Sequence, residues 1–140
     1  MDVREAYERW PDKGPLSDGR RLTLLTLRTT LAPGDTLRVA HVYEVTEPGG
    51  DLYVMGPKPV YGEQLDGRPV TPAPPAGDEA LKPLEYDGRV LPSPGIDHNF
   101  QTTTYTFTRP GEHALTWQIG ELVSNTLAIE VQPESTDDRG

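Results

Sequence analysis

The residues of this 140-residue chain best suited to chemistry near neutral pH are its three histidines. One of them, His98, stands between Asp97 and Asn99, shortly after a Pro-Ser-Pro-Gly stretch typical of a loop. Loops on a rigid scaffold often carry binding residues, so we take these three residues as candidate partner contacts, with a simple turn as the alternative. His41 and His113 fall within alternating apolar patterns instead, which predicts hydrogen-bonded structural roles in strands.

The sequence lacks the usual spacings of catalytic and metal-binding residues. None of its serines lies in a Gly-x-Ser-x-Gly pattern, and no glycine-rich phosphate loop, EF-hand loop or His-Glu-x-x-His occurs. The absence of cysteine excludes thiol catalysis and zinc sites with Cys ligands. We therefore predict a protein that is not an enzyme and has no catalytic residues, metal or cofactor. A small hydrolase using acidic residues and His98 is the weakest alternative.

The charge balance is strongly acidic. Asp and Glu total 22 against 13 Lys and Arg, giving a net charge of −9. This field repels phosphate backbones and anionic lipid heads, so we predict neither nucleic-acid nor membrane binding and favour a protein partner with a basic surface. No apolar run is long enough to span a bilayer, and the first residues do not resemble a secretory signal. We therefore expect a cytoplasmic location. The sequence does not indicate the oligomeric state.

Residues 1–12 predict a short helix or arm. Asp2 is a suitable N-cap, Glu5 and Arg9 are one turn apart, and Pro11 ends the helix. The apolar side of this helix would carry Val3, Ala6, Tyr7 and Trp10. Such a short helix is marginal on its own in water, so we expect it to dock on its own domain, with a partner-binding arm as the alternative.

Three strands are expected before the middle of the chain. Residues 22–31 are apolar with imperfect alternation, which predicts a strand with a bulge or a change of sheet near Leu24. Residues 36–46 alternate cleanly and predict a half-buried strand, and residues 52–55 predict a short one. Clusters of Pro, Gly and Asp separate these segments as turns.

Residues 56–99 form a Pro/Gly-rich insertion. Residues 56–95 contain 9 Pro and 6 Gly, and so long a stretch without structure of its own is uncommon in a compact domain. Asp-Gly pairs, the strongest short hairpin signal, lie at the centres of residues 63–70 and 84–91, which predicts two small hairpins. The Pro- and Ala-rich residues 71–78 between them predict an extended, solvent-exposed linker.

Aromatic side chains gather around this insertion. They are Tyr53, Tyr61 and Tyr86, accompanied by Met55. Tyrosine supplies much of the binding energy at protein and sugar interfaces, so we take Tyr61 and Tyr86 as candidate partner contacts. The alternative is a satellite core beneath the long loop.

The C-terminal third carries the clearest strand pattern. Residues 102–108, 113–119 and 127–131 each alternate between apolar and polar side chains, and Gly120-Glu121 predicts a two-residue type II′ turn. The polar residues 133–140 predict a disordered tail.

This third also carries a resemblance to a known family. The run Tyr105-Thr-Phe-Thr-Arg-Pro-Gly-Glu-His-Ala-Leu-Thr-Trp-Gln-Ile-Gly, followed by Val123-Ser-Asn-Thr-Leu-Ala-Ile-Glu-Val, resembles the closing three strands of bacterial immunoglobulin-like modules. In those modules a Pro-Gly turn precedes a strand with an inward aromatic residue, and a Ser-Asn pair opens the last strand. The resemblance implies a β-sandwich but no single function, because such modules serve many.

Together these patterns predict an all-β fold. We expect residues 20–132 to form a single immunoglobulin-like antiparallel β-sandwich domain, preceded by the short helix and elaborated by the long insertion. We predict a non-catalytic protein-interaction module that binds through the 56–99 loops, as a component of an assembly or as an accessory or inhibitor of its partner. A carbohydrate-binding module, with an aromatic face for a sugar ring, is the main alternative.

Overall fold

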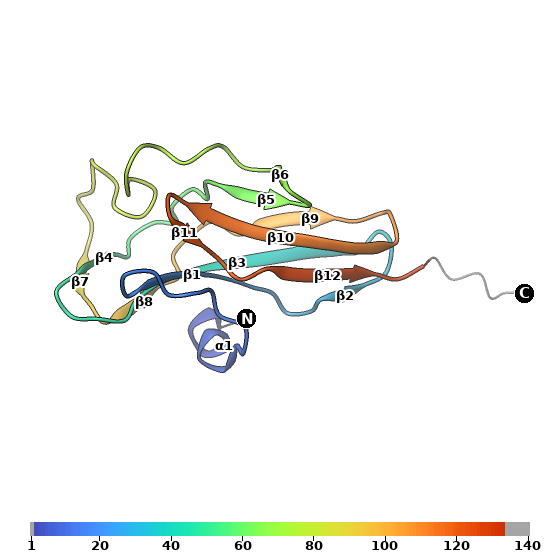
Figure 1. Ribbon diagram of the computed structural model, residues 1–140, viewed down its shortest axis with the longest axis horizontal. Coiled ribbons are helices and arrows are strands. Elements are labelled where there is room, and N and C mark those ends of the chain that lie inside the picture. Colours follow the sequence, from blue (N-terminus) through green and yellow to red (C-terminus); the bar gives the residue numbers. More distant parts are fainter. Residues whose placement is uncertain (1, 134–140) are drawn as a thin grey trace, which may run out of the picture.

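The computed structural model describes residues 2–133, so the predicted disordered tail lies outside the described residues, apart from Pro133. Within this range the chain forms one helix and twelve strands, most of them short (Figure 1). In chain order they are α1 (Val3–Arg9), β1 (Arg20–Leu25), β2 (Thr30–Leu31), β3 (Thr36–Val45), β4 (Asp51–Tyr53), β5 (Glu63–Leu65), β6 (Arg68–Pro69), β7 (Val90–Pro92), β8 (Gly95–Asp97), β9 (Thr103–Thr106), β10 (Gly111–Ile119), β11 (Leu122–Val123) and β12 (Leu127–Val131).

The strands form two main sheets and a separate ribbon. In the first sheet β3 lies in the middle, with β1 on one side and β8 and β9, one after the other, on the opposite side. The second sheet has the order β2-β12-β10-β5-β6, and β11 forms a hairpin with β10. Strands β4 and β7 pair as a two-stranded ribbon at one end of the molecule (Figure 1). The predicted all-β class with mainly antiparallel pairing is confirmed; β2 and β12 are parallel.

The N-terminal strand changes sheet, but later than we predicted. β1 pairs with β3 as far as Leu25, and β2 pairs with β12 from Thr30 onward. Leu24 stays in the first sheet, and its outer edge is sealed by Asn125. The side-chain amide of Asn125 accepts a hydrogen bond from the Leu24 N–H at 2.7 Å and donates one to the Leu24 carbonyl at 3.0 Å.

One continuous apolar core joins the two main sheets. The alternation predicted for residues 127–131 is confirmed, because Leu127, Ile129 and Val131 are buried while the residues between them are exposed. The inward side chains of β1 and β3 meet those of β10 and β12 in the same cluster. Burial of these apolar side chains is the main stabilising contribution in a fold without disulfides.

Helix α1 docks on the outer face of the first sheet, as predicted. Asp2 caps it by accepting a hydrogen bond from the Glu5 N–H, and Tyr7 packs against Leu25 and Val42. The Tyr7 hydroxyl also donates a hydrogen bond to the Glu44 carboxylate; burial and this carboxylate raise the pKa of Tyr7 to about 12. The helix explains why β3 is buried on both faces near its centre, where the sequence predicted a half-buried strand.

The insertion differs from its prediction in one of its two hairpins. Residues 63–69 form the first hairpin around Asp66 and Gly67, whose positive φ angles of 52° and 81° suit a tight two-residue turn. The prediction of a second hairpin at residues 84–91 is wrong. Its Asp87-Gly88 pair makes no strand-to-strand turn, and residues 90–92 pair with β4 instead. Residues 71–76 of the predicted linker carry no helix or strand.

Candidate functional site

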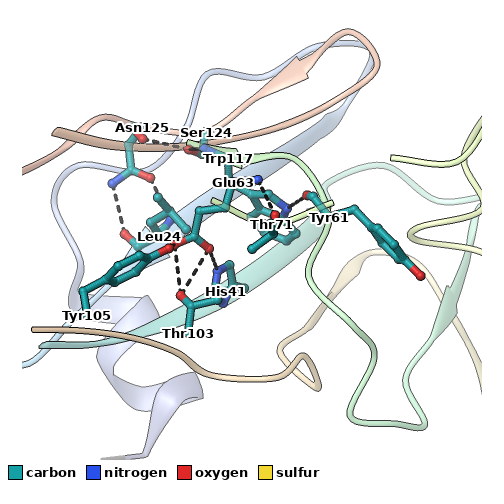
Figure 2. A network of polar contacts seen from close by, with 10 residues as sticks. All are labelled: Leu24, His41, Tyr61, Glu63, Thr71, Thr103, Tyr105, Trp117, Ser124 and Asn125. Atoms are coloured by element: carbon teal, nitrogen blue, oxygen red, sulfur yellow. Dashed lines mark hydrogen bonds and ion pairs between the residues drawn. The ribbon is translucent and has the colours of Figure 1, made fainter. Parts of the chain in front are cut away.

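A fully buried cluster of polar side chains lies between the two main sheets (Figure 2). Glu63 extends inward from β5, and its Oε1 lies 2.5 Å from Nε2 of His41 on β3, with neither side chain exposed to solvent. Thr103 and Tyr105 on β9 both donate hydroxyl hydrogen bonds to the same carboxylate. The pair therefore joins β3, β5 and β9 across the sandwich.

The hydrogen-bond pattern indicates which ring nitrogen of His41 faces Glu63 as a donor. Nδ1 of His41 is buried without a hydrogen-bond partner among the described residues, which is less costly for a lone pair than for an N–H. We therefore assign the tautomer of His41 in which Nε2 donates to the Glu63 carboxylate. Burial and the adjacent Glu63 raise the pKa of Tyr105, which keeps its hydroxyl protonated as a donor. His41 has the structural role predicted for it.

Neighbouring polar groups in Figure 2 are also satisfied internally. The Trp117 indole N–H donates to the Tyr61 carbonyl at 2.9 Å, and the Glu63 backbone N–H donates to the Thr71 hydroxyl at 2.9 Å. The Ser124 hydroxyl accepts a hydrogen bond from the backbone N–H of Trp117 at 2.8 Å. These bonds fix the strands relative to one another, so this network serves the architecture rather than a ligand.

A buried ion pair between Lys58 and Asp97 anchors the insertion. Nζ of Lys58 lies 2.7 Å from Oδ2 of Asp97 and donates to the Tyr53 carbonyl at 2.7 Å. It also lies 3.4 Å from the Met55 and Asn99 carbonyls and 4.6 Å from the centre of the Phe100 ring. A single ammonium thus holds together the chain just after β4 and the chain just after β8.

Asp97, His98 and Asn99 occupy three different environments. Asp97 was predicted as a partner contact; this is corrected, because Asp97 is buried and its carboxylate is engaged by Lys58 and the Asn99 N–H. The Asn99 side chain is half-buried and donates to the Val54 carbonyl at 2.8 Å. Of the three, His98 alone is exposed. The predicted loop is therefore mostly an anchor.

The two candidate tyrosines are half-buried and lie apart. The Tyr61 side chain packs partly buried against the main core, and its backbone carbonyl accepts from the Trp117 indole N–H. The Tyr86 hydroxyl donates to the Arg89 carbonyl and accepts from the Met55 N–H, and its ring packs edge-to-face on Tyr53 with centroids 5.1 Å apart. Tyr86 therefore fixes the shape of the loop that carries it, and Tyr61 belongs to the core rather than to the same surface.

Around Tyr86 lies an apolar surface, of which the sequence indicates Tyr53, Met55 and Tyr86 but not Leu84 and Val90. Met55, Leu84 and Val90 are large apolar residues that are 51%, 84% and 45% exposed. Val90 is paired with Tyr53 in the β4–β7 ribbon, and Met55 lies against Gly88 and Tyr86. We call Tyr53, Met55, Leu84, Tyr86 and Val90 the ribbon surface, in which Leu84 is included for its exposure and its position two residues before Tyr86.

Acidic residues border the ribbon surface. Asp51, Glu85 and Asp87 are exposed on the segments that form it, with Arg89 as the nearby basic residue. The sequence does not single out Leu84 and Val90, because the Asp-Gly pair between them predicts a hairpin over residues 84–91. The available signal was a leucine, a tyrosine and a valine at two- to four-residue spacing within an otherwise polar stretch.

Comparison with known proteins gives no relative: no family model, no curated protein and no solved structure matches the chain. Among the described residues, no helix is long and apolar enough to cross a membrane. Within residues 2–133 no three His, Asp or Glu side chains are grouped to hold a metal ion.

Proposed function

We propose that this chain is an immunoglobulin-like β-sandwich that binds a partner protein through the ribbon surface. The strand order supports the fold: β1, β3 and β9 share one sheet and β5, β10 and β12 the other, as strands A, B, E and C, F, G do in immunoglobulin domains. The part of the Pro/Gly-rich insertion that follows β5 then lies between strands C and E and supplies Leu84, Tyr86 and Val90.

The observation that carries the binding role is an apolar surface that is both exposed and held in shape. Exposed apolar groups that gather in one place commonly mark interaction sites. Here the Tyr86 hydroxyl bonds and the Lys58–Asp97 ion pair fix the backbone beneath the side chains. Pre-organisation of this kind lowers the entropy cost of binding.

The border of the ribbon surface indicates the chemistry of the partner. Asp51, Glu85 and Asp87 are exposed on the segments that carry the apolar side chains, in keeping with the net charge of −9. We infer a partner that presents an apolar patch bordered by Lys or Arg, in an assembly or as the target of an accessory or inhibitor. Edge-to-face packing of Tyr53 and Tyr86, with an interplanar angle of 85°, offers no shared flat face for a sugar ring.

Matched substitutions test this function. The intact chain is used as bait in extract from its native source, beside Leu84→Ser and Val90→Thr. The controls are Leu27→Ser and Val123→Thr, at residues that are 78% and 39% exposed but lie outside the ribbon surface.

We expect one polypeptide to be retained by the wild type and by both controls and lost with both ribbon variants. Unfolding curves would confirm that all four variants are as stable as the wild type, because surface substitutions change stability little. Equal retention by ribbon variants and controls, or no retained polypeptide at all, would contradict the proposal.

A further inference from the structure

The first sheet ends one strand earlier than the sheet that covers it. β3 lies opposite β10, because the rings of His41 and Trp117 pack edge-to-face 5.0 Å apart. β9 lies opposite β5, because Thr103 and Tyr105 reach Glu63. The second sheet continues beyond β5 with β6, whereas within residues 2–133 no strand follows β9. Among the described residues, no strand therefore occupies the position beside β9 and beneath β6; we call this the empty position.

The backbone of β9 is oriented to use this position. Phe107 donates its N–H to Asp35, at 3.4 Å, and accepts from the Gly34 N–H, at 2.7 Å, so its backbone faces the β3 side. Backbone groups alternate along a strand, so those of Thr103 and Tyr105 also face β3. The N–H and C=O groups of Thr104 and Thr106 consequently point toward the empty position.

The open edge of β9 also lacks the protection found on other edges. Residues 101–108 contain no charge, no proline and no glycine. By contrast, β6 contains Arg68 and Pro69, and the edge of β1 is sealed by the Asn125 amide on Leu24. Proteins normally block open edges with charges, proline or cover, so an unblocked edge is suited to pairing with another strand.

The side chains next to the empty position indicate which kind of segment would pair there. Tyr105 and Leu65 are partly buried and pack against the core at this side of the sandwich. Arg68 is opposite Leu65 in the β5–β6 register, so its side chain extends on the same side as Leu65. On the outer face, exposed Arg38 is paired with Thr104. Neither arginine makes an ion pair in the described part of the chain.

We infer that β9 pairs with an extended segment of a partner protein and so adds a strand to the first sheet. Apolar side chains of that segment would cover Tyr105 and Leu65, and acidic side chains would meet Arg38 or Arg68. A second copy of this chain is a poorer occupant, because pairing of two β9 edges would bring β6 of one copy onto β5 of the other. This inference does not rest on the ribbon surface.

Hydrogen exchange with a synthetic peptide tests the pairing. The probe is a nine-residue peptide of alternating valine and glutamate, added at millimolar concentration to the intact chain, with a proline-interrupted version as control. We expect slower exchange at the Thr104 and Thr106 amides, which face the empty position. Exchange at Thr103 and Tyr105, already paired with β3, should not change. Unchanged exchange at Thr104 and Thr106 would overturn the inference.

A charge exchange tests the chemistry of the occupant. The wild type should bind the valine-glutamate peptide at least about threefold more tightly than a valine-lysine peptide, the size expected of exposed ion pairs. The double variant Arg38→Glu/Arg68→Glu should reverse this preference. Arg4→Glu/Arg89→Glu, with the same change in net charge, should keep it. An unchanged preference in the first variant, or a reversal in both, would contradict a site at β9.

Discussion

The hydrogen-bonded pair of His41 and Glu63 and the ion pair of Lys58 and Asp97 are both buried, but they stabilise different parts of the molecule. His41 and Glu63 lie at the centre of the sandwich, and the side chains that complete their hydrogen bonds come from β9. Lys58 and Asp97 lie in the loop region at one end, and the cation is completed mainly by backbone carbonyls. The first pair joins strands that the apolar core already holds together, whereas the second sets the course of a chain with little core of its own.

This difference predicts different responses to the loss of one partner. Removal of one member of a buried pair leaves an uncompensated charge or unsatisfied donors, and at the centre of a sandwich water cannot reach them without global unfolding. In a terminal loop region, local opening lets water in, and the free energy of that opening limits the loss. The central pair should therefore control global stability and the terminal pair local order.

The largest effect is expected from Glu63→Ala. The substitution leaves three donors, His41 Nε2 and the hydroxyls of Thr103 and Tyr105, without their buried acceptor. At about 1–3 kcal/mol for each unsatisfied group, we expect a loss of about 3–5 kcal/mol in the free energy of unfolding. Denaturant unfolding would measure it, with Gln64→Ala on the opposite face of β5 as the control expected to cost less than about 1 kcal/mol. A similar, small loss in both variants would mean that the central pair is not a structural link.

A smaller and more local effect is expected from Lys58→Met. The substitution leaves the Asp97 carboxylate buried without its cation, and we expect a loss of about 1–3 kcal/mol, the usual cost of an unsatisfied buried group. Amide exchange should accelerate in residues 51–58 and 84–99 while β3 and β10 keep their protection. Lys82→Met, at an exposed lysine, is the control. Acceleration throughout both sheets would remove the distinction between the two pairs.

Gly88→Ala should change the ribbon surface with little change in stability. A Cβ at this position would lie 2.4 Å from Cγ of Met55 and 2.9 Å from Cζ of Tyr86, so both side chains must move. We expect altered side-chain NMR signals for Met55 and Tyr86 and weaker partner binding, with a stability loss of at most about 1 kcal/mol. Unaltered signals would show that these side chains do not meet at Gly88.

The smallest effect on stability is expected from the more exposed pair of His113 and Asp66. Nδ1 of His113 lies 2.8 Å from Oδ2 of Asp66, and this hydrogen bond, with one from the Ala114 N–H, lowers the pKa of Asp66. A lowered pKa in the folded state stabilises the fold above the unfolded value of about 4, and that contribution is lost as the pH falls further. Stability between pH 5 and pH 2.5 should therefore fall more in the wild type than in Asp66→Asn. Parallel curves would show that this pair contributes nothing.

Local pattern was enough to predict much of the scaffold. The alternation in residues 113–119 and 127–131 corresponds to β10 and β12, and the Gly120-Glu121 turn joins β10 to β11. The capping residue and the apolar side of α1 could also be predicted from the sequence, since they depend on neighbours within two helical turns.

Features that depend on pairing between distant segments could not be predicted from the sequence. Lys58 and Asp97 are far apart in sequence, so no pattern in the residues around Asp97 predicts its burial. The hairpin predicted around Asp87 failed because Val90–Pro92 completes the β4 ribbon, and Gly88 there makes room for Met55 and Tyr86 rather than for a turn. His41 within an inward-facing run did signal a buried polar partner, but its identity as Glu63 required the register of two sheets.

Site-specific photo-crosslinking tests most directly whether the ribbon surface binds a protein. Benzoylphenylalanine would replace Leu84 in one sample and Leu27 in the other, both on the full chain expressed in its native source, followed by irradiation and mass analysis. We expect a crosslinked polypeptide from position 84, at a yield lowered by Gly88→Ala, and none of that mass from position 27. The same products from both positions, or none from position 84, would contradict a binding role for the ribbon surface.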